Sequence, residues 1–277
     1  MSKIVLFITA TAVFILFLTC AQGVADNIDY LFNETKKYPN SAVAHNKLGL
    51  AYFNIGKHDK AIIEYKKALN IDPNLPLVYN NIGSVFHKLG LFREAINEYR
   101  RGLKLMPDSH EILNNLGISL ITIKEYEGAI KVLKKATLIN PTSSNTRNIL
   151  GVAYLSLKRY DDAINEFNEE IKITPQGFRP RKHLGTVYYK LGKYNEAISA
   201  LKEAVTIKPE NGDTRAFLGF LYDLVGDGEN AVLHLRQAIY FLGKDKKFHA
   251  KDKADQMLTG VIEKYGFIER DLPQISQ

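Results

Sequence analysis

Apolar and small residues recur along this chain with a fixed period of 34 residues. Each of six periods contains a Leu-Gly or Ile-Gly pair, and an apolar residue, usually aromatic, follows three residues after the glycine. The glycines are Gly49, Gly83, Gly117, Gly151, Gly185 and Gly219. A strict repeat of this length predicts stacked copies of one supersecondary unit.

Each period is long enough for two helices. The Leu, Gly and aromatic positions form one apolar stripe on a first helix. The second helix carries an alanine, with a large apolar residue four positions later. We expect the helices to cross at this alanine, with the glycine allowing close approach. The alanines are Ala61, Ala95, Ala129, Ala163, Ala197 and Ala231.

Proline and glycine mark the expected helix ends at fixed positions of the 34-residue period. Proline closes five of the units, at Pro73, Pro107, Pro141, Pro175 and Pro209, and Gly243 takes this place in the sixth. Proline cannot continue a helix, so it separates one unit from the next. Gly56, Gly90, Gly192 and Gly226 share another register, which suits the left-handed residue that ends a helix.

The pattern predicts an all-α fold whose units must stack, because one helix pair cannot bury both of its faces. The expected units are 42–75, 76–109, 110–143, 144–177, 178–211 and 212–245. Residues 26–41 read as a half-repeat, with its helix at 27–37, that caps the first unit. Residues 246–277 read as an amphipathic capping helix and a tail, since solenoid ends need polar outer faces.

These positions resemble the tetratricopeptide repeat over residues 42–245. The resemblance implies a right-handed superhelical solenoid whose first helices line a concave groove for a protein or peptide partner. The family's bulky apolar position, three residues before the Leu, holds His45, Tyr79 and Leu113 in the first three units, then Arg147, Arg181 and Arg215. Glu170 and Gly102 replace the usual second alanine. We expect these departures to weaken single contacts and to leave the fold intact.

The N-terminus has the anatomy of a signal peptide. Lys3 precedes the uncharged apolar run 4–18, and small residues lead to Ala25 and Asp26. We expect export, to the periplasm or the medium if cleavage falls near Ala25. Two alternatives stay open. Residues 4–25 could remain as an inner-membrane anchor with the repeats outside the cytoplasm, or Cys20 could be lipidated.

Composition narrows the chemistry. The 277 residues carry a formal charge of +7 that is spread along the chain, which does not favour nucleic acid. The single cysteine excludes an intramolecular disulfide and a cysteine-based metal site. The seven histidines are scattered through different units without metal-ligand spacing. We therefore expect no catalytic residue, metal or cofactor, and membrane contact only through residues 4–25.

One row of polar residues suggests a binding role. Asn46, Asn80, Asn114 and Asn148 each stand two positions before the Leu of a unit, where the resemblance implies the groove. Asparagine is a mediocre helix former, and its amide both donates and accepts hydrogen bonds. An exposed row could bind the backbone of an extended peptide. Alternatively, the amides bond to one another or to water. We expect Asn81 and Asn115 to join neighbouring units.

Positive charge follows this asparagine row. Arg179, Lys182 and Lys190 lie on the expected concave face of the fifth unit. Such a cluster favours an acidic segment or a C-terminal carboxylate, although solvated surface charge is the plainer alternative. Apolar residues are also expected in the groove, at Leu50, Phe53, Ile118, Ile121, Val152, Leu155 and Phe220. An uncovered apolar surface of this size favours a bound partner.

The sequence thus predicts a non-enzymatic protein-interaction scaffold in an extracytoplasmic assembly or secretion context. Two alternatives remain. The repeats could be the substrate-binding arm associated with an O-linked glycosyltransferase-type enzyme, or the chain could be a membrane-tethered organiser of a complex. The repeats occupy most of the chain, which disfavours a second, catalytic domain.

Overall fold

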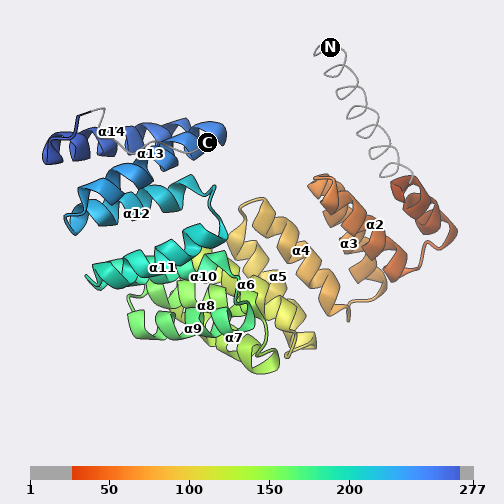
Figure 1. Cartoon of the computed structure of the whole chain (residues 1–277). Coiled ribbons are helices and arrows are strands. Elements are labelled where there is room, and N and C mark those ends of the chain that lie inside the picture. The colour runs from red at the N-terminus through yellow and green to blue at the C-terminus, as the bar shows by residue number, and fades with distance from the viewer. Residues whose placement is uncertain (1–26, 269–277) are drawn as a thin grey trace, which may run out of the picture. The chain divides into compact units, whose positions relative to one another are not determined.

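A computed structural model describes residues 27–268, where every regular element is an α-helix (Figure 1). The expected signal or anchor segment, Cys20 and the end of the tail lie outside the described residues. A first helix covers residues 27–37. The others are α2 (Ala42–Asn54), α3 (His58–Ile71), α4 (Pro76–Lys88), α5 (Phe92–Leu105), α6 (His110–Thr122), α7 (Tyr126–Ile139), α8 (Ser144–Ser156), α9 (Tyr160–Ile173), α10 (Phe178–Lys190), α11 (Tyr194–Ile207), α12 (Gly212–Leu224), α13 (Gly228–Lys244) and α14 (Phe248–Tyr265).

The described residues fall into two compact units, 27–125 and 126–268. Unit 1 contains the helix at 27–37 and α2 to α6, and unit 2 contains α7 to α14. The division falls between the two helices of the expected third repeat. Within unit 1, α2 packs on α3 and α4 on α5. Within unit 2, α8 packs on α9, α10 on α11 and α12 on α13. The all-α, helix-turn-helix repeat architecture is therefore as the sequence predicts.

In the first, second, fourth, fifth and sixth repeats, the glycine lies where the two helices meet, at Gly49, Gly83, Gly151, Gly185 and Gly219. A Cβ atom added to Gly185 would lie 2.5 Å from Cδ2 of Leu201, on the second helix. The same atom on Gly49 would lie 2.6 Å from Cε1 of Tyr65. The constant spacing therefore places a glycine against the large apolar residue four positions after the alanine. Ala197 itself is fully buried, as the crossing requires.

The turns between paired helices use a left-handed residue in one register. Gly56 and Gly192 have φ values of 74° and 72°, which confirms the role expected for these glycines. The third and fourth repeats have Lys124 and Lys158 there, with φ values of 63° and 59°. A residue with a side chain adopts this region at a steric cost, so these two turns are strained.

Polar side chains at the position three residues before the Leu gain hydrogen-bond partners in the turn before their helix. Nε2 of His45 lies 3.1 Å from the carbonyl oxygen of Pro39. Tyr79 donates its hydroxyl to Pro73, and Arg215 donates Nε to Pro209, in each case across six residues. These bonds join a first helix to the turn that precedes it.

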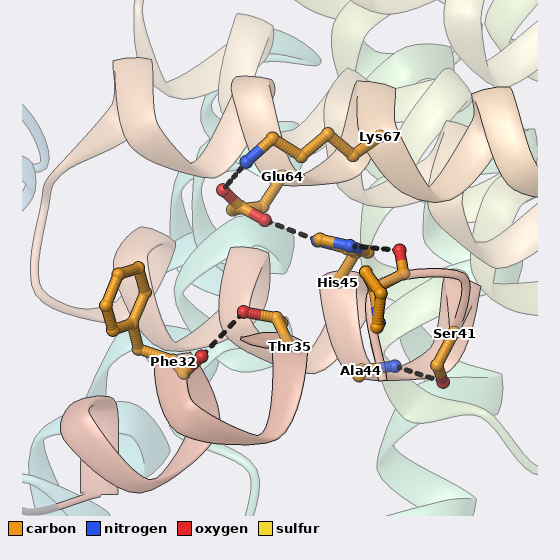
Figure 2. Close-up of polar contacts among 8 residues, drawn as sticks. Phe32, Thr35, Ser41, Ala44, His45, Glu64 and Lys67 are labelled. Carbon is orange, nitrogen blue, oxygen red and sulfur yellow. Dashed lines mark hydrogen bonds and ion pairs between the residues drawn. The ribbon is translucent and has the colours of Figure 1, made fainter. Parts of the chain in front are cut away.

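His45 also reaches the second helix of its own repeat. Figure 2 shows its imidazole between the turn and Glu64, whose Oε2 lies 2.6 Å from Nδ1 of His45. The other carboxylate oxygen of Glu64 accepts from Lys67 at 2.7 Å. Because His45 and Glu64 are both buried, each supplies the partner that the other needs.

The last repeat is covered by α14, which packs on α13. Val261 is buried there, and Met257, Leu258 and Ile262 pack against the same core cluster. Lys264 holds the helix to the last repeat by donating to Oδ1 of Asp223 at 2.7 Å. The amphipathic helix expected from the sequence thus covers the apolar end of unit 2.

None of the helices in residues 27–268 combines the length and the apolar character that crossing a membrane requires.

Candidate partner-binding face

The first helices of successive repeats lie beside one another. In unit 1, α4 contacts both α2 and α6, and in unit 2, α8 contacts α10. The Tyr189 ring on α10 meets Phe217 and Phe220 of α12, with centroids 5.5 and 5.7 Å apart. We call the surface formed by these first helices within each unit the first-helix face. It carries the residues that the sequence assigned to a groove.

The asparagine row is largely buried, so its expected exposure is wrong. Asn80 is 2% exposed, and Asn114 and Asn148 are each 7% exposed. Asn46 is partly buried. Asn80 donates Nδ2 to Oε1 of Glu111 at 2.8 Å. A buried amide needs such a partner, because an unmade hydrogen bond costs free energy in the protein interior.

Neighbouring repeats are joined through this row. Asn81 donates to Oδ1 of Asn46, and Asn115 donates to Oδ1 of Asn80, both at 2.9 Å. The expected role of Asn81 and Asn115 in joining neighbouring repeats is therefore confirmed. These two hydrogen bonds give Asn46 and Asn80 a structural role that needs no ligand.

In unit 2 the row meets a buried carboxylate. Asn148 donates Nδ2 to Oε2 of Glu170 at 2.7 Å. Burial raises the pKa of Glu170, while the bond from Asn148 and the charge of Arg179 act in the opposite direction. Glu170 stands where the family has a second alanine, and the amide of Asn148 compensates for that departure.

The three basic residues on α10 do not form one cluster. Arg179 and Lys182 lie near His183, and both help burial to lower the pKa of this imidazole to about 4. Lys190 ends the helix eleven residues after Arg179, which corresponds to roughly 16 Å of helical rise. Its Nζ atom lies 5.6 Å from the centroid of the Tyr189 ring. The expected basic zone is therefore split between the two ends of α10.

Two apolar groove residues of unit 1 lie together. Phe53 and Ile118 line a hollow of about 200 Å³ on the first-helix face. The rest of its lining consists of Ser84, His87, Lys88, Tyr99 and Asn115. Leu50 lies apart, in a hollow of about 400 Å³ against the helix at 27–37. Val152 is partly buried on α8.

A larger apolar hollow lies in unit 2, and the sequence identified only Phe220 of its lining. Its volume is about 600 Å³, and it opens between α10, α12, α13 and α14. The lining residues are Tyr189, Asp213, Ala216, Phe217, Phe220, Leu242, Ala250, Lys253, Ala254 and Met257. We call it the aromatic hollow. The signal that could have revealed it is Ala216, the small residue that takes the place of Asn148 in the last repeat.

Within residues 27–268, no group of three or more histidine, cysteine, aspartate or glutamate side chains is placed to hold a metal ion.

The helix pairs and their glycine contacts define a class of α-helical repeat proteins, and comparison with known proteins identifies which one. Profiles described as TPR repeat or tetratricopeptide repeat match residues 49–90, 81–144, 145–176 and 180–211. The chain belongs to the tetratricopeptide-repeat family. Comparison with curated proteins finds no match.

Solved structures agree with this assignment. A crystal structure of MamA protein is 28% identical, with a TM-score of 0.57, over 61% of this chain and 93% of MamA. Pseudomonas aeruginosa pilF is 23% identical, with a TM-score of 0.63, over 76% of this chain and 97% of pilF. YrrB, described as a TPR protein with an unusual peptide-binding site, is 18% identical, with a TM-score of 0.57, over 65% of this chain and 92% of YrrB. The pilF and YrrB likenesses concern the fold alone.

Proposed function

We propose that this chain is a non-enzymatic scaffold whose first-helix face binds a segment of a partner protein. The observation that carries the proposal is the aromatic hollow. Three aromatic rings, Tyr189, Phe217 and Phe220, gather there beside Met257, and all four side chains remain partly accessible. Concave, mostly apolar sites of about 300–1,000 Å³ are the usual form of ligand pockets, and aromatic anchors dominate protein interfaces.

The unusual peptide-binding site described for YrrB supports the same class of function for this fold, although that site belongs to YrrB only. The asparagine row is left out of the proposed binding surface, because Asn80, Asn114 and Asn148 are buried and Asn46 accepts a hydrogen bond from Asn81. Within unit 2 the proposed surface is instead the aromatic hollow, and Phe53 and Ile118 form a separate candidate surface within unit 1.

The test begins with tagged full-length protein recovered from its own host, followed by purification of the protein that accompanies it. Dissociation constants are then compared for the parent, for Phe220→Ala and for Leu138→Ala. Leu138 is the matched control, because it is an apolar residue on a second helix and is 82% exposed. Truncating an aromatic anchor typically costs about 2 kcal/mol or more, which is roughly thirtyfold in Kd.

We expect Phe220→Ala to weaken binding by this amount and Leu138→Ala to leave it unchanged, with both variants folded by circular dichroism. Equal binding by Phe220→Ala, or a loss confined to Leu138→Ala, would place the partner elsewhere. A purified complex that shows enzymatic turnover would favour the alternative of a substrate-binding arm.

We further propose that the scaffold acts outside the cytoplasm, in an envelope assembly or secretion context. The support is the apolar run of residues 4–18, followed by small residues up to Ala25. N-terminal sequencing of the protein from fractionated cells tests this. We expect a mature chain that begins near Asp26. An intact N-terminus in the membrane fraction would indicate a retained anchor, and an intact N-terminus in the cytosol would refute export.

A further inference from the structure

We infer that the aromatic hollow takes an acidic peptide segment, in which a large apolar side chain enters the hollow and neighbouring carboxylates meet Lys190 and Lys253. The inference rests on the proposed function and names the chemistry of the partner segment. It also moves the acidic ligand away from Arg179, which lies at the other end of α10.

The hollow exists because small residues stand where the rest of the array has larger ones. Ala216 holds the register of Asn148 and Lys182 in the two preceding repeats. Ala250 and Ala254 face the hollow from α14. No side chain from these three positions is long enough to fill the space above the rings. A large apolar side chain from a partner could therefore bury its surface there and gain about 25 cal/mol for each Å² removed from water.

The aromatic walls have defined geometry. The Tyr189 ring stands edge-on to Phe217 and Phe220, at interplanar angles of 89° and 77°. Phe217 and Phe220 are nearly parallel, at 19°, with centroids 6.4 Å apart. Each ring packs against the other two, so binding has less side-chain freedom to restrict.

The charge at the hollow is positive. Lys253 lines it, and the ammonium of Lys190 lies over the Tyr189 ring that forms its wall. Among residues 27–268, neither lysine has a carboxylate within ion-pair distance. Asp213 is the single acidic residue in the lining, and its Oδ2 already accepts from Lys247 at 2.6 Å. Two uncompensated ammonium groups therefore remain for the carboxylates of a ligand, and repel a basic one.

The probes are short, N-acetylated and C-amidated fluorescent peptides with one central Phe. Its neighbours are Asp in the first peptide, Asn in the second and Lys in the third. Affinities for the full chain are measured by fluorescence polarisation at low and at physiological salt. We expect the order Asp, then Asn, then Lys, and a preference for Asp that shrinks as salt screens the exposed charges.

Two kinds of variant locate the binding. Lys190→Gln and Lys253→Gln should each weaken the Asp peptide about two- to fivefold, as expected for exposed ion pairs, and should leave the Asn peptide unchanged. Lys202→Gln is the matched control, because Lys202 is an exposed lysine on α11 outside the hollow. Ala216→Leu fills the hollow and should weaken the Asp and Asn peptides alike. If Ala216→Leu does not fold, the lysine variants still decide the question.

The inference is overturned if no peptide binds, if the Lys peptide binds as tightly as the Asp peptide, or if Lys202→Gln has the same effect as the other two lysine variants. Self-association of the chain that competes with the Asp peptide would assign the hollow to a second copy. These outcomes are distinct from failure of the proposed function. A partner that still requires Phe220 but has no acidic segment would sustain the proposed function and refute this inference.

Discussion

Replacing Gly185 by Ala adds one methyl group, and the structure predicts that this small change destabilises unit 2. The new Cβ would lie 2.5 Å from Cδ2 and 2.6 Å from Cγ of Leu201. Leu201 is fully buried, so its side chain cannot move aside into solvent. Overpacking of this kind typically costs about 1–3 kcal/mol. The better helix propensity of alanine offsets at most roughly 1 kcal/mol of this destabilisation.

A matched control separates propensity from packing. Gly260 lies within α14 and is exposed, and nothing would lie within 4 Å of a Cβ atom added there. Gly260→Ala should therefore raise the free energy of unfolding by roughly 0.5–1 kcal/mol. The same substitution thus has opposite signs at the two sites, because only Gly185 faces a buried side chain.

Urea unfolding of the parent, Gly185→Ala, Leu201→Ala and the double variant measures the contact itself. Leu201→Ala alone should cost about 2–5 kcal/mol by opening a cavity. The double variant should lose less than the two single losses added together, because the cavity accepts the new methyl group. Strictly additive losses, or a Gly185→Ala variant as stable as the parent, would refute the close approach of the two helices.

Three further predictions concern strained or buried groups. Lys158→Gly should raise the free energy of unfolding by about 1 kcal/mol, because a left-handed residue with a side chain costs roughly 1–2 kcal/mol. Urea unfolding of the variant and the parent measures this difference. Burial lowers the pKa of His183 and His234 to about 4. Their neutral forms therefore stabilise the fold fully above about pH 6.5, and this contribution is lost as the pH falls towards 4. The free energy of unfolding of His183→Gln should therefore fall less than that of the parent over this pH range. Glu64→Ala should cost about 1–3 kcal/mol, because it leaves Nδ1 of buried His45 without a partner, and thermal unfolding measures this loss.

The period of the sequence was enough to predict the helices and the glycine contacts, since those depend on neighbours within one repeat. The burial and the hydrogen bonding of Asn80 could not be predicted in the same way. Its hydrogen-bond partner, Glu111, comes from the next repeat, and one sequence does not show which long side chain will reach it. The sequence alone therefore predicts exposed mid-helix asparagines.

The aromatic hollow escaped prediction for a related reason. It requires Ala216 of the last repeat and two alanines of α14 to face the same space, and α14 lies outside the repeat register. The strain at Lys124 and Lys158 was missed because lysine gives no sign of a left-handed backbone. Only the four glycines at that register carried the signal.

The claim that partners bind the first-helix face is tested most directly by photo-crosslinking in the host. A photoreactive phenylalanine analogue is placed at Phe220 or Ile118 on the first-helix face, and at Ile63 or Leu138 on second helices. The second-helix positions are the exposed controls, at 52% and 82%. We predict that the same partner protein is crosslinked from Phe220 or Ile118 and not from the controls. Crosslinking of that partner from Ile63 or Leu138 alone would contradict the claim.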